Sequence, residues 1–434
     1  MTTFADLGLP RGIVNVLNKQ GITEPFPIQE AAIPDALAGK DVLGRGPTGS
    51  GKTFTFGLPI LARLEGAPSK PGHPRALVLA PTRELATQIR ERLDEPAAAL
   101  GLRVLDVVGG VNINHHIRAL ASPVDLLVAT PGRAEDLINQ KKLSLDSVEI
   151  SALDEADQMA DMGFLPQVRK LLDRTPKDGQ RLLFSATLDG DVEKLICRYM
   201  HDPVTHSTAP VEAAVDTMDH YRLMVGGREQ RNDIAMQIAA REGKTIMFMR
   251  TKHGVDRQVK KLRRAGIHAQ GLHGDKGQGA RTRALEGFAS GETPVLVATD
   301  IAARGIDVDD VSLVVHVDPP AEHKAYLHRA GRTARAGTSG TVVTLVMDDQ
   351  SKEVSQLLRK AGVDAPEVKV APLSESLVTI TGARQPEGAP LPPPGQSQQP
   401  KRATGSGNRK TGGNRSRGNN RARRSDRSRR SNGR

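Results

Sequence analysis

Short apolar runs rich in β-branched residues recur along most of the chain, and helix-length segments of mixed polarity separate them. Runs with little polar alternation are typical of strands buried on both faces, as in the parallel sheets of α/β proteins. In the first half of the chain the expected strands are residues 41–43, 76–80, 104–108, 125–129, 150–153 and 182–185. In the second half they are residues 245–249, 269–272, 295–298, 313–317 and 342–346.

Two such series predict two doubly wound α/β domains with parallel sheets, arranged in tandem. We expect the boundary between them in the weakly patterned, proline-containing stretch 206–216. The first domain would span residues 1–206, a linker residues 207–217, and the second domain residues 218–372. A charged, helix-like segment at residues 350–361 would close the second domain.

The composition changes in the last part of the chain, residues 373–434. Prolines are followed there by Gly, Ser, Gln and Asn and then by Arg, and no aromatic residue occurs after Tyr326. Such a segment cannot bury enough apolar surface to offset the entropy lost on ordering. We therefore expect residues 373–434 to form a disordered tail.

The positive charge of the chain is concentrated in this tail. The formal net charge is +11, and residues 401–434 contain 13 Lys and Arg but one acid, Asp426, so the remainder of the chain is nearly neutral. A positive block on a flexible arm is typical of polyanion binding. We expect the tail to tether nucleic acid without sequence preference, with a purely solubilising role as the alternative.

The cysteine content and the apolar runs limit the cellular setting. The single cysteine, Cys197, excludes an intrachain disulfide and a cysteine metal cluster and favours a reducing compartment. Its apolar helical surroundings favour a place in the core. The N-terminus shows no signal sequence, and no apolar run reaches the roughly 18 residues of a membrane span. These features predict a cytoplasmic protein without membrane contact.

A glycine-rich loop follows the first expected strand. Residues 46–53 read G-P-T-G-S-G-K-T, the pattern in which backbone N–H groups surround phosphate oxygens before a helix N-terminus. Lys52 would reach the β- and γ-phosphates, and the Thr53 hydroxyl would bind Mg²⁺. The expected phosphate-binding residues are Pro47, Thr48, Gly49, Ser50, Gly51, Lys52 and Thr53. The alternative is a glycine-rich turn that matches by chance.

Acidic residues follow the expected strand 150–153, in the sequence D-E-A-D at residues 154–157. A carboxylate at the carboxyl end of a parallel strand points into the ligand crevice. Asp154 can hold Mg²⁺ through water, and Glu155 can orient and deprotonate the attacking water. Alone, these acids would equally suit a helix N-terminus. Together with the phosphate loop, they favour a nucleoside triphosphatase.

A basic segment of the second domain, residues 328–335, could supply positive charge to the departing γ-phosphate. Arg332 and Arg335 are three residues apart and would share a face if the segment is helical. If the domains stack, these arginines complete the site only in the closed state, which couples hydrolysis to closure. The alternative is an exposed basic turn of helix.

The D-E-A-D sequence resembles the motif that names the DEAD-box RNA helicases of superfamily 2, and the chain resembles their bacterial type. Further segments resemble the family's motifs in the family's order, over about residues 3–346. They are Phe4 with Gly21 and residues 25–29, then residues 81–86, 109–110, 130–133, 185–187, 273–281, 298–307 and 328–335. The resemblance implies two RecA-like domains, ATP and Mg²⁺ as cofactors, and RNA as partner.

The resemblance also implies roles for individual residues. Glu155, Lys52, Asp154, Arg332 and Arg335 would be catalytic, while Phe4, Gln29 and Asp307 would bind the nucleoside. Asp157, Ser185, Thr187 and His328 would link the ATP state to the RNA. Thr82, Arg83, Gly110, Thr130, Gly132, Arg133, Arg281 and Thr299 would contact RNA. Ile22 and Phe26 depart from the family, which usually has an aromatic residue and Thr there, and Ala330 and Ala334 replace its usual Ile and Gly.

The expected RNA contacts are donors suited to phosphate oxygens, and such contacts position a strand without reading its bases. With no Trp and 3% aromatic residues, base stacking is a poor source of affinity. The sequence predicts an ATP-dependent RNA helicase that grips the backbone and opens short duplexes. Two alternative functions stay open: an ATP-gated RNA clamp or chaperone, and a DNA translocase. Ribosomal or RNA-decay proteins are possible partners.

Overall fold

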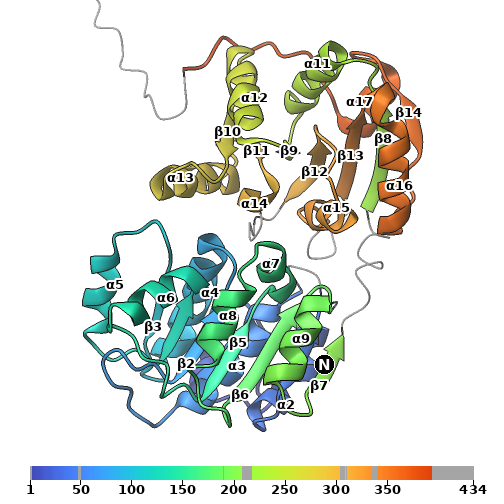
Figure 1. Cartoon of the computed structure of the whole chain (residues 1–434). Coiled ribbons are helices and arrows are strands. Elements are labelled where there is room, and N and C mark those ends of the chain that lie inside the picture. The colour runs from blue at the N-terminus through green and yellow to red at the C-terminus, as the bar shows by residue number, and fades with distance from the viewer. Residues whose placement is uncertain are drawn as a thin grey trace, which may run out of the picture. The chain divides into compact units, whose positions relative to one another are not determined.

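The computed structural model describes residues 2–46, 50–188, 190–207, 218–303, 308, 310–334 and 340–392. Within these residues the chain forms two seven-stranded sheets, each made by one half of the sequence (Figure 1). All pairings in both sheets are parallel. The expected α/β class with two doubly wound, RecA-like domains is confirmed.

The sheet of the first domain has the order β3-β4-β2-β5-β6-β1-β7. Its strands are β1 Val42–Arg45, β2 Ala76–Leu79, β3 Val104–Val107, β4 Leu126–Ala129, β5 Ile150–Leu153, β6 Gln180–Ser185 and β7 Val204–Ser207. The edge strand β7, which pairs with β1, was not expected from the sequence. Its alternating, half-exposed residues do not form the continuous apolar run of a central strand.

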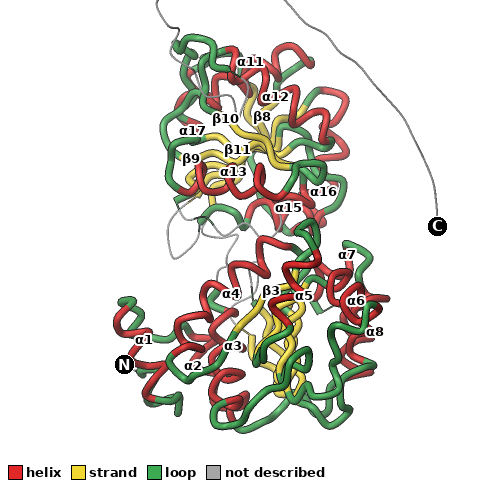
Figure 2. The backbone as a smooth tube through the Cα atoms, turned by 90° about the vertical axis from the view of Figure 1, so that its left-hand side faces the viewer, coloured by secondary structure: helices red, strands yellow, loops and turns green. Residues whose placement is uncertain are grey.

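Helices cover both faces of this sheet (Figure 2). They are α1 Arg11–Lys19, α2 Pro27–Leu37, α3 Lys52–Leu64, α4 Arg83–Ala98, α5 Ile113–Leu120, α6 Pro131–Asn139, α7 Ala156–Asp161, α8 Leu165–Leu172 and α9 Gly190–Tyr199. Neighbouring residues of one strand belong to different apolar cores: Val78 packs on one face of the sheet and Leu79 on the other. This double burial explains why the strands read as unbroken apolar runs.

The second domain repeats the same topology, with the order β10-β11-β9-β12-β13-β8-β14. Its strands are β8 Met218–Met224, β9 Lys244–Phe248, β10 Ala269–Leu272, β11 Val295–Ala298, β12 Val311–His316, β13 Gly340–Val346 and β14 Glu367–Lys369. Its helices are α11 Arg228–Ala239, α12 Lys252–Arg264, α13 Gln278–Ala289, α14 Asp300–Ala303, α15 His323–Ala330, α16 Ser351–Ala361 and α17 Glu375–Thr381, with the short 3-10 helix η1 Asp348–Gln350. Each strand expected from the sequence is present, with ends within two residues of the prediction.

The tail begins later than the sequence predicts. Residues 373–392 pack on the second domain, and α17 places Leu377 in its core, where it is fully buried. Beyond α17, the Leu391 N–H donates to the Arg263 carbonyl at 2.8 Å. The apolar residues here are too sparse to resemble a core segment, yet they complete an existing core. The prediction of disorder is therefore wrong for residues 373–392, and residues 393–434 lie outside the described part.

The position of Cys197 and the linker between the domains were also expected from the sequence. Cys197 lies exposed on α9, so its expected place in the core is wrong. The expected linker falls almost entirely on residues 208–217, which lie outside the described residues, between β7 and β8.

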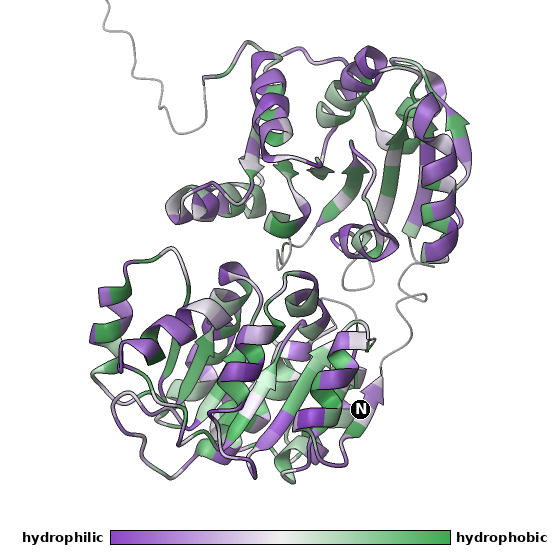
Figure 3. Cartoon of the chain, viewed as in Figure 1, coloured by the Kyte–Doolittle hydropathy of each residue, from purple (hydrophilic) through white to green (hydrophobic). Residues whose placement is uncertain are grey.

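Among the described helices, none combines the length and the apolar character that a membrane crossing requires. Figure 3 shows apolar strands and more polar outer helix faces.

Candidate nucleotide and nucleic-acid sites

The described part of the phosphate loop lies between β1 and α3. The Lys52 Nζ, at the start of α3, donates to the Gly46 carbonyl at 3.0 Å and to Glu155 Oε1 at 3.0 Å. Gly51 ends the loop with a φ of 86°, a left-handed conformation that favours glycine. Pro47, Thr48 and Gly49 lie outside the described residues. The structure thus brings Lys52 together with Glu155, an acid of the D-E-A-D sequence.

Burial makes the charges of this pair depend on each other. Both side chains are more than nine-tenths buried. Burial lowers the pKa of Lys52, but the carboxylates of Glu155, Asp154 and Asp157 raise it by more. Burial likewise raises the pKa of Glu155, but the charge and the hydrogen bond of Lys52, together with the charges of Arg332 and His328, lower this pKa to about 2. Glu155 is therefore held as a carboxylate.

The pKa of Asp154 is shifted in the opposite direction from that of Glu155. Burial is the main cause that raises its pKa to about 7, although the charge of Lys52 acts against this rise. Its Oδ1 accepts the Glu155 N–H at 3.0 Å. A buried carboxylate whose charge is incompletely balanced suits a hard divalent cation, which prefers oxygen ligands. With the Thr53 hydroxyl on the first turn of α3, the oxygen donors present fit Mg²⁺.

Gln29 joins α2 to the end of the phosphate loop. The Phe26 N–H donates to Gln29 Oε1 at 2.8 Å, and Gln29 Nε2 donates to the Gly51 carbonyl at 3.0 Å. A Cβ on Gly51 would lie 2.6 Å from Gln29 Nε2, so the contact itself requires glycine.

Phe4 is buried in the first core, which gives it a packing role and does not support its expected contact with the nucleotide.

Asp157, the last acid of the motif, connects α7 with the segment after β6. Its Oδ2 accepts the Thr187 N–H at 3.0 Å and the Thr187 hydroxyl at 3.2 Å. The Asp157 N–H donates to Ser185 Oγ at 3.2 Å. His328 Nε2 of α15 lies 4.0 Å from Asp157 Oδ2. The four residues expected to couple the nucleotide to RNA therefore form one cluster.

The arginine segment differs from the expected helix. Helix α15 ends at Ala330, so Arg332 follows the helix, and the condition for a helical face shared with Arg335 is not met at Arg332. Arg335 lies outside the described residues, as does Asp307. The Arg332 Nε donates to the His328 carbonyl at 3.2 Å. Its charge contributes to the low pKa of Glu155, after the larger effects of burial and Lys52.

Arg329 is a buried residue for which no separate role was expected from the sequence. Its Nη2 donates to Asp300 Oδ2 at 2.8 Å and its Nη1 to the Asp318 carbonyl at 2.8 Å. Its guanidinium lies 5.0 Å from the centre of the Phe248 ring. Arg329 thus fixes α15, and with it the start of the arginine segment, on the second sheet.

The expected RNA contacts gather around one groove of about 490 Å³. Its lining includes Thr82, Arg83, Thr130, Gly132, Arg133 and Arg281. Gly110 lies against Arg83, whose Nη1 would be 1.9 Å from a Cβ at this glycine. Thr299 is half-buried just before α14 and is outside the lining. Six of the eight predicted residues therefore share this groove.

Hydrogen bonds hold several of these donors in place. Thr82 caps α4 by accepting the Leu85 N–H at 3.3 Å, and Thr130 Oγ1 accepts the Gly109 N–H at 3.3 Å. Arg133 Nη1 donates to His116 Nδ1 at 2.8 Å. Burial, followed by the charge of Arg133, lowers the pKa of His116, so a neutral imidazole accepts this bond.

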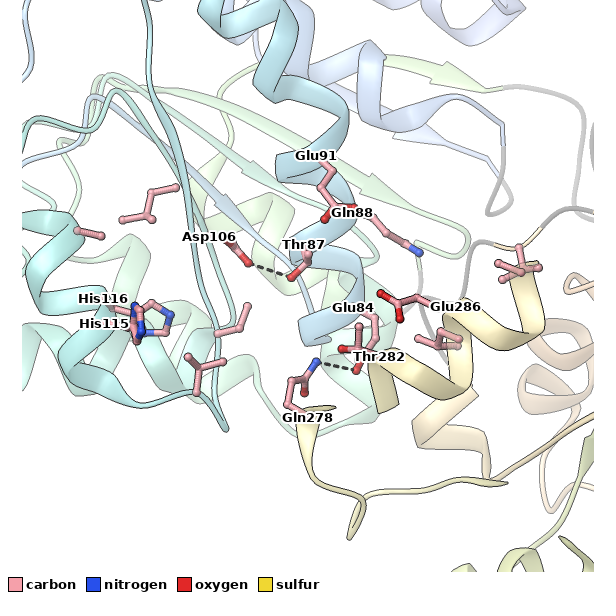
Figure 4. Close-up of a pocket in the computed structure, with 17 residues that line it drawn as sticks. Glu84, Thr87, Gln88, Glu91, Asp106, His115, His116, Gln278, Thr282 and Glu286 are labelled. Atoms are coloured by element: carbon pink, nitrogen blue, oxygen red, sulfur yellow. Dashed lines mark hydrogen bonds between the residues drawn. The ribbon is translucent and has the colours of Figure 1, made fainter. Parts of the chain in front are cut away.

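Glu84 is one of three acids that line this groove, with Glu135 and Asp136, and no role was expected for it from the sequence. Its Oε1 accepts a hydrogen bond from Arg281 Nε at 2.7 Å and one from Gln278 Nε2 at 3.4 Å. Figure 4 shows Glu84 opposite Gln278, with the Thr87–Asp106 hydrogen bond on the neighbouring turn of α4. Because the Arg281 guanidinium already donates to Glu84, an RNA phosphate would have to compete with this carboxylate for it.

Family models agree with the two domains. A model described as DEAD/DEAH box helicase matches residues 26–195, and one described as helicase conserved C-terminal domain matches residues 230–337. The chain is 38% identical over 379 residues to a DEAD-box ATP-dependent RNA helicase CshA of Geobacillus kaustophilus, covering 87% of this chain and 80% of that protein. It is 39% identical over 376 residues to an ATP-dependent RNA helicase DBP2 of Meyerozyma guilliermondii, covering 84% and 68%.

Solved structures show the same similarity. S. cerevisiae Dbp5 bound to RNA and ADP BeF3 is 28% identical, with a TM-score of 0.78, over 88% of this chain and 99% of that chain. The DEAD-box helicase Mss116 bound to ssRNA and UDP-BeF is 26% identical, with a TM-score of 0.76, over 87% and 82%. The phosphate loop, the acid cluster and the long matches to curated helicases lead to one assignment: the chain belongs to the DEAD-box family of ATP-dependent RNA helicases.

Proposed function

We propose that the chain uses ATP hydrolysis, coupled to closure of its two domains, to grip RNA by its backbone and separate short duplexes locally. The observation that carries this proposal is the buried pair of Lys52 and Glu155 at the phosphate loop. A cation for the phosphates and a carboxylate for the attacking water stand side by side there. Relatives bound to RNA and nucleotide analogues support the choice of ligands.

At the nucleotide, Lys52 exchanges its present partners for phosphate oxygens. Once its Nζ leaves Glu155, that carboxylate can accept a proton from water. Thr53 and Asp154 would hold Mg²⁺, which neutralises phosphate charge when it is bound. Arg332, from the second domain, stabilises the negative charge that grows on the departing phosphoryl group.

Coupling to RNA follows from the cluster around Asp157. This acid is bonded to Thr187 and approached by His328, so a change at the nucleotide reaches both domains through one carboxylate. The groove residues Thr82, Arg83, Thr130 and Arg133 offer donors for phosphate oxygens, which position a strand without sequence readout.

The decisive experiment measures ATP hydrolysis with and without RNA for Glu155→Gln and Lys52→Ala. We expect Glu155→Gln to bind ATP and RNA while its turnover falls by at least about 100-fold, since general-base catalysis contributes on this order. We expect Lys52→Ala to lose turnover because it lacks the phosphate ligand. A wild-type rate in Glu155→Gln would refute the general-base role, and retained turnover in Lys52→Ala would refute the phosphate site.

Two comparisons separate the remaining alternatives. An enzyme keeps RNA-stimulated ATP hydrolysis when residues 401–434 are deleted, whereas a chaperone that acts through its tail loses its main effect. Stimulation by single-stranded RNA and by single-stranded DNA, measured at the same salt concentration, separates a helicase acting on RNA from a DNA translocase. The cytoplasmic location, and ribosomal or RNA-decay proteins as partners, stay predictions.

A further inference from the structure

A row of positive side chains lies on the solvent side of α12 in the second domain. We call it the α12 row: Arg257, Lys260, Lys261 and Arg264. These residues stand at positions i, i+3, i+4 and i+7, the spacing of one helix face, and all are exposed. The opposite side of α12, with Val255, Val259 and Leu262, is buried in the core. Figure 3 shows the polar character of this helix.

No acid neutralises the α12 row within the part of the chain that the structure describes. The one acid of the helix, Asp256, is engaged by His273 at 3.1 Å and by Lys276 at 2.8 Å. Like charges at i+3 and i+4 destabilise a helix. An ordinary solvated face mixes both signs, as α16 of the same domain does with Lys352 and Glu353. The α12 row therefore suits a polyanionic partner.

The two ends of α12 connect the row to both RNA-related parts of the chain. At its first turns, Lys252 lies 2.6 Å from Asp275 and Asp256 contacts His273, both in the loop that resembles an RNA-contacting motif. At its last turn, Arg263 Nε donates to the Pro392 carbonyl at 2.6 Å. Pro392 is the last described residue before the basic segment 401–434. From Arg257 to Arg264 the helix rises about 10 Å, at 1.5 Å per residue.

We propose that the α12 row binds the phosphate backbone of RNA that extends beyond the strand held in the groove lined by Thr82, Arg83 and Arg133. The inference rests on RNA as the partner of the proposed function and adds a second contact surface to it. Exposed Lys and Arg side chains bind phosphates without sequence preference and release counterions, so their contribution depends on salt. The row leads such RNA along α12 toward the place where the tail begins.

The test combines Arg257→Gln, Lys260→Gln, Lys261→Gln and Arg264→Gln in one full-length chain. Glutamine keeps a long side chain and a good helix propensity, so the fold should survive. Affinity is measured over a salt series for two RNAs: a short single strand sized for the groove, and the same strand extended by a duplex. We expect unchanged affinity for the short strand. For the extended RNA we expect a loss of about tenfold and a salt slope reduced by about 3, for four phosphate contacts.

A matched control removes Lys352, Arg359 and Lys360 of α16 in the same way. These cations are also exposed in the second domain, and their variant should bind both RNAs like the wild type. If the fourfold variant fails to fold, the double variant Arg257→Gln, Lys261→Gln gives the same test with about half the change in slope.

Several results would overturn the proposal. Wild-type affinity and slope for the extended RNA would show that the row does not touch RNA. Binding of poly-glutamate is measured in parallel. If the fourfold variant lost binding to poly-glutamate but bound both RNAs like the wild type, the row would be assigned to an acidic protein. Equal losses on both RNAs would place the row in the groove itself. If the wild-type chain bound neither RNA, the proposed function would fail, independently of α12.

Discussion

Gly44 gives a sharp test of packing beside the phosphate loop. It lies on β1 opposite Phe184 of β6, and an added Cβ would come within 2.3 Å of the Phe184 ring. Phe184 in turn packs against Phe56, with ring centres 5.4 Å apart. We expect Gly44→Ala to lower the free energy of unfolding of the first domain by about 1–3 kcal/mol, the usual cost of overpacking.

The matched control for this prediction is Gly279→Ala. Gly279 is exposed in α13, and an added Cβ would make ordinary contact at 3.5 Å. Alanine in a helix is favoured over glycine by about 0.5–1 kcal/mol, so this variant should be neutral or slightly stabilised. Thermal or urea unfolding measures both. Equal stability of the two variants would show that Phe184 moves aside at little cost.

Some residues of the nucleotide site were predictable from the sequence, and others were not. Lys52 and Glu155 were predictable because each belongs to a local pattern next to a strand. Glu84, Arg329 and His116 were not, because their roles come from partners distant in sequence, such as Glu84 with Arg281. A charged residue gains such a role only when the fold brings its partner near, and local patterns carry no such information.

At the scale of elements, strands that read as apolar runs were predictable, such as β2 and β4. They include β3 and β10, each at one edge of its sheet. The edge strands β7 and β14 are short and half-exposed, the inner strand β8 mixes polar with apolar residues, and α17 has few apolar residues. These four elements were not predicted, because they gain their stability from the sheet or core they join rather than from an apolar run of their own.

Truncation tests the role of α17. A chain that ends at Pro372 lacks Leu377 and Ala383, which are buried in the core of the second domain. Burying one Leu side chain stabilises a fold by about 1.5–3 kcal/mol, so we expect a loss of at least this size in the second domain. A chain that ends at Pro392 should unfold like the full-length protein. Identical unfolding of the two truncated chains would contradict a structural role for α17.

At the scale of the whole molecule, the division into two domains was predictable because the strand series repeats, and the resemblance implied a RecA-like fold for both, but the order of the strands was not predicted. Sequence runs indicate strands without giving their neighbours, and strand order appears only when the sheets form. The start of the tail was also placed too early, since its first part completes the second domain.

The charge of the tail leads to a prediction about the intact chain. Residues 401–434 contain 13 basic residues and one acid. Deleting them should weaken RNA binding and flatten its dependence on salt, since fewer counterions are released. RNA-stimulated ATP hydrolysis at saturating RNA should stay near the wild-type rate. Binding titrations from low to moderate salt measure the slope, and an unchanged slope would show that the tail makes no contact with RNA.

The repeated strand order has a consequence for stoichiometry. Each strand of the first sheet has a counterpart in the second, so β8 stands where β1 does. Between β1 and α3 the chain has the six residues 46–51, but between β8 and α11 it has only the three residues 225–227. Three residues are too few to encircle a triphosphate. The first domain thus has a loop long enough to hold a nucleotide and the second has not, so we expect calorimetry to measure one ATP bound per chain.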